Sequence, residues 1–311
     1  MVDVIIIGAG PAGVFAARRA AELGAKTTLI TRDEFGGMGA TDGPVPVRTL
    51  AHAARLIREA RQLSQYGIAV SEPVLEYPRQ LARVREVVAD VRTLSLRRED
   101  MDRLGVTVYE KAGTARCVDP HTIETESGLR LQADKIILCA GGMSRRLSVP
   151  GFELTATHSD AWSATAVPPS MLVIGGGATG VQLASIFNAF GSEVQLFQAG
   201  PRILPTEDED VSAAVAAAFR RAGIAVREGF GAIESFEKKP SGVRMVFSKG
   251  NRRDVAEAAA AFVAVGWVAD SAGLNLARAG VETDARGYVR VDSRCGLLRR
   301  TSTQRATSPA A

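Results

Sequence analysis

Two glycine-rich turns with the same spacing constrain the fold of this 311-residue chain more than any other feature. The first, Gly8-Ala9-Gly10-Pro11-Ala12-Gly13, follows an apolar run, and the second, Gly175-Gly176-Gly177-Ala178-Thr179-Gly180, follows another. A G-x-G-x-x-G turn between a strand and a helix directs the amide end of the helix at a pyrophosphate. One such turn is weak evidence, but two in one chain predict two dinucleotide-binding units.

In each turn the first glycine allows the bend, the second lets the backbone approach the phosphates, and the third lets helix and strand pack closely. The predicted phosphate-binding residues are Gly8, Gly10, Pro11, Ala12 and Gly13 in the first turn, and Gly175, Gly177, Ala178, Thr179 and Gly180 in the second.

An acidic residue that would bind the ribose hydroxyls is expected about 20 residues after each turn, and it is absent both times. Thr31 occupies that position in the first unit, with Asp33 as a substitute acid, and Gln198 occupies it in the second. Gln198 neither repels a 2′-phosphate nor offers it a cation, although Arg202 nearby could do so. The sequence therefore leaves NADH and NADPH undecided.

The remaining pattern predicts helices over 48–66 and 79–104 and an antiparallel meander over 106–139. In the second unit, Thr206-Glu207-Asp208-Glu209 is typical of a capping box that begins a helix, and the apolar run 258–265 predicts a strand. The predicted class is α/β and three-layered, with two Rossmann-like dinucleotide-binding domains and an antiparallel meander.

The composition argues against several other classes of protein. The three cysteines form no close pair, which predicts no disulfide and no metal site, and no apolar run reaches the roughly 20 residues of a membrane helix. Without a signal peptide, we expect a soluble, cytoplasmic protein. The net charge of +4 is accounted for by four arginines, unaccompanied by acids, within 293–311, so nucleic-acid binding is not expected.

Further motifs occur in a fixed order: Phe35-Gly36-Gly37, Gly113-Thr114-Ala115, Cys139-Ala140-Gly141-Gly142, Val149-Pro150-Gly151 and Ala264-Val265-Gly266. With the two turns, they make residues 1 to about 292 resemble the FAD-dependent pyridine nucleotide-disulfide oxidoreductases, the family of dihydrolipoamide dehydrogenase, mercuric reductase and soluble transhydrogenase. The resemblance implies an FAD-binding domain over 1–149, an NAD(P)-binding domain over 150–268, and a return to the FAD domain over 269–292. It adds these cofactor-binding residues: Thr31, Arg32, Gly36, Gly37, Arg48, Gly113, Ala115, Ala140, Gly141, Gln198 and Gly266.

The departures from the family bear on the chemistry. Gly39 and Pro44 stand where the family has its two redox cysteines, so the resemblance excludes disulfide reduction by the family's route. The family's lysine near the flavin falls on Arg48 and its glutamate partner on Gln182, which makes these two the candidate catalytic residues. Alternatively, both simply pack between helices. The expected partner is a small electron acceptor, such as a quinone, a dye, oxygen or a second nicotinamide.

Residues 293–311 depart from the family completely. The resemblance implies a second flavin motif ending in Gly-Asp and then a dimerisation domain of a homodimer, and neither follows here. Back-translation from Cys295, read one base earlier, gives a peptide similar to that motif. We interpret the segment as an aberrant, disordered tail caused by a frameshift, and expect weak flavin binding. The expected function is that of an FAD-dependent oxidoreductase that passes hydride from NAD(P)H to flavin and on to a non-disulfide acceptor. The alternatives to this function are a truncated, non-catalytic nucleotide-binding remnant of such an enzyme and a dinucleotide sensor.

Overall fold

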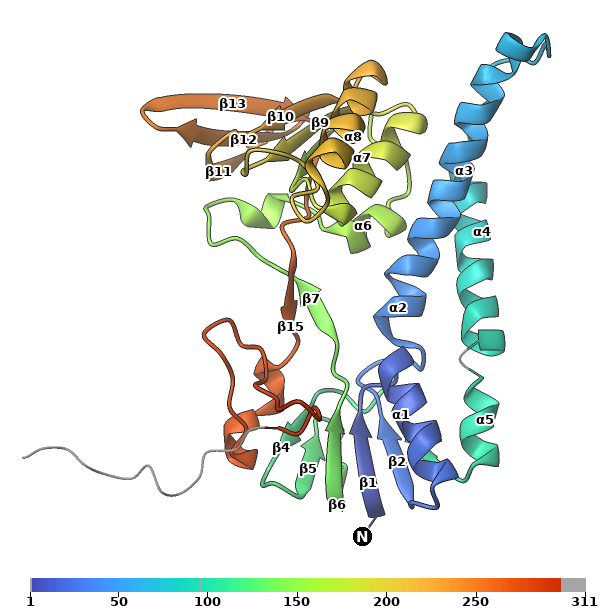
Figure 1. Cartoon of the computed structure of the whole chain (residues 1–311), viewed down its shortest axis with the longest axis vertical. Helices are drawn as coiled ribbons and strands as arrows, with labels where there is room; N and C mark the ends of the chain where they lie inside the picture. The colour runs from blue at the N-terminus through green and yellow to red at the C-terminus, as the bar shows by residue number, and fades with distance from the viewer. Residues whose placement is uncertain (1, 96, 298–311) are drawn as a thin grey trace, which may run out of the picture. The chain divides into compact units, whose positions relative to one another are not determined.

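The computed structural model describes residues 2–95 and 97–297, which form two compact units (Figure 1). The first contains the chain up to Thr41, Asp90–Met143 and the residues from Val268 on; the second contains Asp42–Ala89 and Ser144–Trp267. The division expected from the sequence left 42–89 in the first domain. They group with the second unit because apolar residues such as Leu50 and Leu81 share a core with Leu183.

The first unit is built on a six-stranded sheet in the order β3-β2-β1-β6-β5-β4. Its strands are β1 (Val2–Ile7), β2 (Thr27–Ile30), β3 (Thr107–Tyr109), β4 (Ala115–Cys117), β5 (Thr122–Thr125) and β6 (Arg130–Leu138). The pairs β3–β2, β2–β1 and β1–β6 are parallel, whereas the pairs β6–β5 and β5–β4 are antiparallel. The expected meander is therefore confined to β4–β6, and β3 extends the parallel part.

Alternation along β1 covers both faces of this sheet. Ile5 and Ile7 belong to one apolar cluster and Ile6 to the cluster on the opposite face, because successive side chains of a strand point to opposite faces. The helices of this unit are α1 (Pro11–Glu22), α2 (Gly37–Thr41) and α5 (Arg98–Arg103).

The single helix expected over 79–104 is wrong. Helix α4 (Tyr77–Asp90) continues as one wider π turn over Val91–Ser95, and α5 starts only after Arg97. Arg97 has a φ of 46°, a left-handed conformation that no α-helix interior accommodates. Its guanidinium pairs with the buried carboxylate of Asp100 at 3.0 Å, which supports this turn locally.

The second unit has a parallel four-stranded sheet in the order β10-β9-β8-β14. These strands are β8 (Ser170–Ile174), β9 (Glu193–Gln198), β10 (Ala225–Glu228) and β14 (Ala260–Val263), and a second, antiparallel sheet contains β11 (Ala232–Lys239), β12 (Gly242–Lys249) and β13 (Arg252–Ala258). The helices are α3 (Pro44–Gln62), α4, α6 (His158–Ser163), α7 (Ala178–Ala189) and α8 (Glu209–Arg221).

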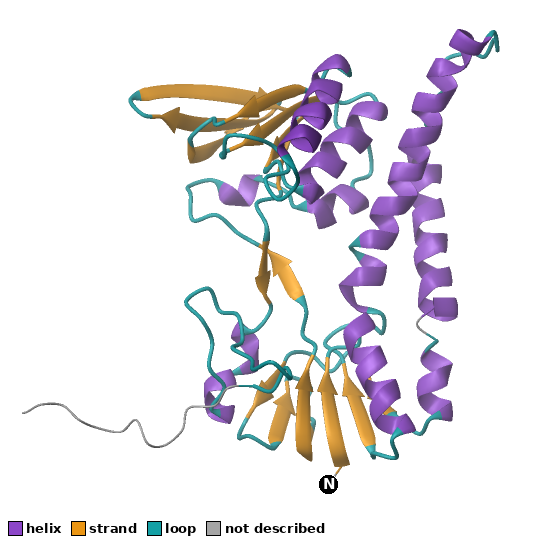
Figure 2. Ribbon diagram, viewed as in Figure 1, coloured by secondary structure: helices purple, strands orange, loops and turns teal. Residues whose placement is uncertain are grey.

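The parallel sheet of the second unit lies between helices and the antiparallel sheet (Figure 2). Met171 and Val173 of β8 pack in the core with α7, whereas Leu172 and Ile174 pack in the core that contains Phe236 and Met245 of the antiparallel sheet. The predicted three-layer α/β class is thereby confirmed.

The start of α8 differs from the prediction. The helix begins at Glu209 with Asp208 as its N-cap, and no side chain caps it. Thr206 Oγ1 instead contacts the carboxylate of its neighbour Glu207, so the capping box expected there is wrong.

The remaining segments connect and close the units. Strands β7 (Gly142–Ser144) and β15 (Trp267–Ala269) pair, and the short 3₁₀ turns Ala272–Leu274 and Leu276–Ala279 pack in the core of the first unit. Residues 293–297 form a turn closed by a bridge between Val291 and Leu297. The rest of the expected disordered tail, 298–311, lies outside the described residues. Within the described ranges, every helix is too short or too polar to span a bilayer.

Candidate dinucleotide-binding sites

The first glycine turn lies at the carboxyl end of β1 and is tightly folded. Gly8 has a φ of 107°, and a Cβ there would lie 2.1 Å from the carbonyl oxygen of Cys139. A Cβ on Gly13 would lie 1.7 Å from the carbonyl oxygen of Gly8. Gly10 is different, because its Cβ would meet only Gly37 Cα at 3.9 Å. The turn therefore needs glycine for packing at two positions and leaves the middle one open, as phosphate approach requires.

The other residues predicted for the first unit surround this turn. The Gly36 N–H donates to Ala9 O at 3.0 Å, and a Cβ on Gly37 would lie 2.5 Å from Gly10 Cα. Thr31 follows β2, while Ala140 and Gly141 follow β6, so parallel strands bring them to the same sheet edge.

Arg32 and the β3–β4 turn complete this edge. Gly113 donates its N–H to Arg32 O at 3.2 Å. Hydrogen bonding to Asp33 and an ion pair of 2.9 Å with Asp270 raise the pKa of Arg32, so it stays cationic. Ala115 lies apart from the other predicted residues, because it is buried within β4 in the apolar core.

The second turn repeats this geometry at the carboxyl end of β8. Gly175 has a φ of 109°, and its Cβ would lie 2.3 Å from Ala264 O, while a Cβ on Gly180 would lie 1.8 Å from Gly175 O. A Cβ on Gly177 would meet no atom within 4 Å. Gly177 has the same extended conformation as Gly10, with φ of −76° and −74° respectively. Both turns thus present an open backbone at the start of a helix.

A cavity of about 700 Å³ opens beside the second turn. Its lining includes six residues predicted from the sequence: Gly175, Gly177, Ala178, Thr179, Gln198 and Gly266. The seventh, Gly180, is buried and packs behind the turn. Leu147, Val149 and Phe230 add apolar walls. A largely apolar cavity with a few polar groups suits a dinucleotide whose phosphates lie on the turn.

Gln198 is fixed by the turn itself. Its Oε1 accepts the N–H of Gly176 at 2.8 Å, which leaves the amide nitrogen as the group available to a ribose. Arg202 is held within its own segment, because its guanidinium donates to Pro205 O, Glu207 O and Ser212 Oγ. The suggestion that Arg202 serves a 2′-phosphate therefore has no support from its geometry.

Arg48 and Gln182 lie on α3 and α7, which pack against each other. Arg58 donates to Ser185 O at 3.1 Å, and a second bond one turn later joins the same helices, so the two run in the same direction. With about 1.5 Å per residue, this register offsets Arg48 and Gln182 by roughly 10 Å along the helices. Both are exposed. The structure thus neither brings them together nor buries them between helices.

All three cysteines are free, and none stands near the positions of the missing thiols in sequence. Burial raises the pKa of Cys117 and of Cys139, which disfavours the thiolate. Gly39 lies in α2, where a Cβ would touch the ring of Pro11 at 3.3 Å, and Pro44 begins α3. The described residues also contain no group of three side chains suited to hold a metal ion.

Sequence reasoning missed a polar cluster on the wall of the cavity. His158 and Ser144 line it, together with Trp267. In the sequence, His158 stands in the segment Thr157-His158-Ser159-Asp160 that leads to the second turn, and it matches no catalytic histidine of the family. Its burial, and its contact with a residue 14 positions earlier, result from chain folding alone.

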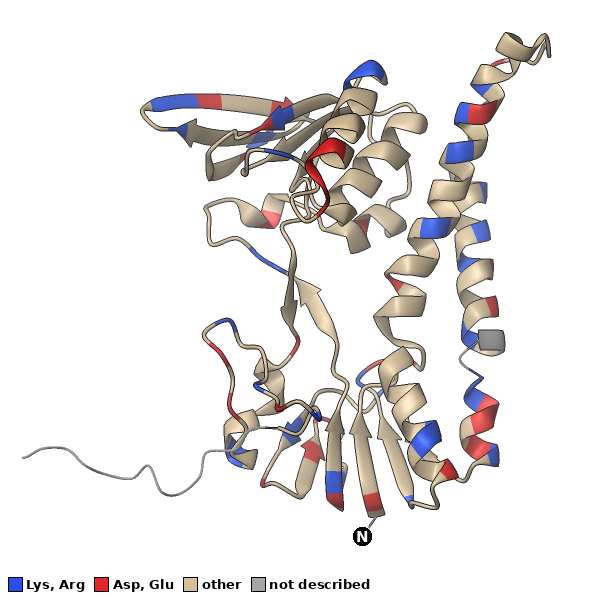
Figure 3. Ribbon diagram, in the orientation of Figure 1, with Lys and Arg blue, Asp and Glu red and all other residues tan. Residues whose placement is uncertain are grey.

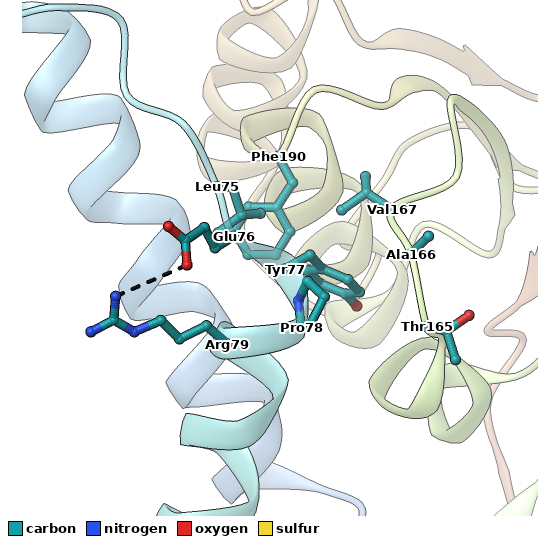
Figure 4. A pocket seen from close by; sticks show the side chains of 9 residues that line it. All are labelled: Leu75, Glu76, Tyr77, Pro78, Arg79, Thr165, Ala166, Val167 and Phe190. Carbon is teal, nitrogen blue, oxygen red and sulfur yellow. Dashed lines mark ion pairs between the residues drawn. The ribbon is translucent and has the colours of Figure 1, made fainter.

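A second hollow in the same unit is lined mainly by apolar side chains, including Leu75, Tyr77 and Phe190 (Figure 4). Tyr77 donates its hydroxyl to Ala161 O at 3.3 Å, and burial raises its pKa to about 12, so it stays protonated and is no base. An ion pair between Glu76 and Arg79 lies at its margin. This hollow offers packing surface rather than chemistry.

The two open glycine turns, each at the carboxyl end of a strand with parallel neighbours, give the chain two candidate dinucleotide-binding sites. Residues 2–305 match the model of the pyridine nucleotide-disulphide oxidoreductase family, so the chain belongs to that family.

Individual proteins of known identity are also similar to this chain. The chain is 32% identical over 301 residues to dihydrolipoyl dehydrogenase of Zymomonas mobilis, covering 93% of this chain and 62% of the relative, and equally similar to that of Thermus scotoductus, at 94% and 63%. Its fold is similar to the HOCl-induced flavoprotein disulfide reductase RclA from Escherichia coli, with a TM-score of 0.82, 24% identity, and coverage of 96% and 64%. The chain thus spans less than two thirds of the length of these proteins.

Proposed function

We propose that this protein is an FAD-dependent NAD(P)H oxidoreductase that passes hydride from NAD(P)H to flavin and on to a small, non-disulfide acceptor such as a quinone, a dye or a second nicotinamide. The observation that carries the proposal is the pair of turns whose middle residues, Gly10 and Gly177, are open. We assign FAD to the first turn and NAD(P)H to the second. We also propose a cytoplasmic location.

In this assignment the residues of the chain would bind the two dinucleotides and orient them. Bound flavin supplies the two-electron chemistry. The free amides at the starts of α1 and α7 would hold the two pyrophosphates, Gln198 would bind a ribose of the nicotinamide dinucleotide, and Thr31 would bind a ribose of FAD. The apolar walls of the cavity would limit access of water to the nicotinamide.

The non-disulfide acceptor follows from the residues at the family's thiol positions. Gly39 and Pro44 carry no sulfur. Burial raises the pKa of Cys117 and of Cys139, and Cys295 lies far from both in the sequence. A dithiol relay needs two neighbouring, reactive thiols. The chain therefore offers no dithiol relay, and an acceptor would have to meet bound flavin directly.

Replacing all three cysteines by alanine tests this route. We expect the variant Cys117→Ala, Cys139→Ala, Cys295→Ala to keep the wild-type rate of NAD(P)H-driven dye reduction, and neither protein to reduce lipoamide. Both activities are measured by NAD(P)H absorbance after incubation with FAD. Lipoamide reduction that disappears in the variant would show that a thiol takes part. Binding of both nucleotides without dye reduction would instead identify a non-catalytic binding protein.

We further propose, from the family resemblance, that Arg48 provides the positive charge beside the flavin and that Gln182 is its neutral counterpart. Arg48→Met should slow flavin reduction by about tenfold, which corresponds to about 1.4 kcal/mol of transition-state stabilisation, with NAD(P)H affinity unchanged. Arg48→Lys should restore most of the rate. Arg55→Met is the matched control, because Arg55 is also an exposed arginine of α3. Equal rates for the two methionine variants would refute the role.

A further inference from the structure

The polar cluster in the cavity wall of the second unit is a linear chain of three side chains. Ser144 Oγ lies 3.1 Å from His158 Nδ1, and the other ring nitrogen, Nε2, lies 3.6 Å from Asp42 Oδ2. Ser144 and His158 line the cavity, whereas Asp42 precedes α3 and keeps 31% of its side chain exposed. This row of three side chains therefore connects a carboxylate in contact with solvent to the cavity assigned to NAD(P)H.

His158 is held firmly in this arrangement. Its side chain is 5% exposed and lies edge-on to Trp267, with ring centroids 4.7 Å apart, and to Trp162 at 6.3 Å. Trp162 Nε1 donates to the backbone oxygen of Asp42 at 2.9 Å, and Ser159 Oγ donates to its carboxylate at 2.5 Å. Both anchors keep the carboxylate facing the imidazole.

The Nε2 atom of His158 is buried and has no hydrogen-bond partner among the described residues, since Asp42 Oδ2 is slightly too distant. A buried polar atom without a partner is costly. Protonation of the imidazole would turn the 3.6 Å contact with Asp42 into an ion pair. Two carboxylates, Asp42 and Asp160, favour this charge, but desolvation is the larger effect and lowers the pKa of His158. The site is therefore poised to gain a proton when a further negative charge arrives.

The protonation state of His158 also decides what Ser144 offers a ligand. With a neutral ring that carries its hydrogen on Nε2, Nδ1 accepts the Ser144 hydroxyl, and Ser144 presents only lone pairs to the cavity. With a protonated ring, Nδ1 donates to Ser144 Oγ, and the hydroxyl hydrogen is free to point at a ligand. Ser144 thus changes from acceptor to donor.

We propose that Asp42, His158 and Ser144 form a proton-coupled binding element for the nicotinamide dinucleotide, so that binding of this anion is accompanied by protonation of His158. The inference rests on the proposed function, because it assigns NAD(P)H to this cavity. Both effects of protonation, a positive charge and a new donor, favour a phosphate-bearing ligand. Affinity should therefore rise as the pH falls.

The experiment titrates NADH and NADPH into the FAD-incubated full chain and follows tryptophan fluorescence. This signal is specific, since the chain has two tryptophans and both contact His158. We expect wild type to bind about tenfold more tightly near pH 5 than near pH 8, the factor that a pKa change of about one unit produces. His158→Asn keeps a hydrogen-bonding group for Ser144 but cannot titrate, so its affinity should lose this dependence.

Two further variants complete the design. His52→Asn removes an exposed histidine of α3 and should behave as wild type. Asp42→Asn should move the pH midpoint of binding downwards, which keeps the test decisive even where His158→Asn does not fold. If wild type shows the same pH dependence as His158→Asn, or the same as Asp42→Asn, the proton-coupled binding element is refuted, while the proposed function still stands. Absence of dinucleotide binding by wild type at either pH overturns the proposed function with it.

Discussion

Gly10→Ala is expected to weaken FAD binding by about 100-fold and leave NAD(P)H binding unchanged, and Gly177→Ala is expected to do the reverse. A factor of 100 corresponds to about 2.8 kcal/mol, the size of one or two charge-assisted hydrogen bonds between turn amides and a phosphate. Both glycines have φ values that alanine adopts without strain. Their methyl groups would protrude into space that the protein leaves open.

The two variants serve as controls for each other, because they make the same change at the same position of equivalent turns. Each is measured by titration with FAD, followed by flavin fluorescence, and with NADH, followed by calorimetry. The melting temperatures of both should match wild type. Loss of both nucleotides in either variant would mean that the change disrupts the fold, and loss of neither would mean that the turns bind no phosphate.

Phe197→Ala is expected to lower the free energy of unfolding of the second unit by about 3–5 kcal/mol. Phe197 is the next-to-last residue of β9 and is fully buried, with the rings of Phe230 and Phe247 at 5.4 and 5.5 Å in edge-to-face contact. Truncation would leave a cavity where these rings meet. It would also loosen Gln198, the next residue, which holds the second turn by its bond to Gly176.

Urea unfolding followed by tryptophan fluorescence measures this effect selectively, since both tryptophans lie in the second unit. The matched control is Val211→Ala on α8 of the same unit, whose side chain is 46% exposed and whose truncation should cost no more than about 0.5 kcal/mol. The packing argument fails if the two substitutions change the unfolding midpoint equally.

The parts of the fold that the sequence predicted are those with local causes. Each glycine turn follows an apolar strand, and its first glycine needs a positive φ that other residues avoid. The strand–turn–helix order around Gly8 and Gly175 is therefore confirmed. The helix expected over 48–66 also forms, although α3 begins four residues earlier, at Pro44, and ends at Gln62.

The errors concern contacts between distant segments. Nothing near Leu50 or Leu81 reveals that their partners lie more than 90 residues later, in α7. The break at Arg97 has no proline or glycine to announce it, and the ion pair of Arg97 with Asp100 is seen only in the folded chain. Val106–Tyr109 resembles a meander strand in composition, and only its partner β2 makes it parallel.

The residues of the candidate sites also fall into those with a local sequence signal and those that only the fold brings into place. The turn residues could be named from spacing alone, since the motif itself forms the site. Arg202 is a cation near the expected ribose position, but its guanidinium already donates hydrogen bonds to three backbone and side-chain oxygens of its own segment. His158 and Ser144 lie outside the glycine turns, and only the fold places both on the cavity wall, with Asp42 behind His158.

The claim that each turn holds its own dinucleotide is tested most directly by calorimetric titration of the wild-type chain with FAD, and then of the FAD-saturated chain with NADH. The account predicts one FAD and one NADH per chain, bound at the same time and without competition. Displacement of FAD by NADH, or heat of binding for neither nucleotide, would contradict it.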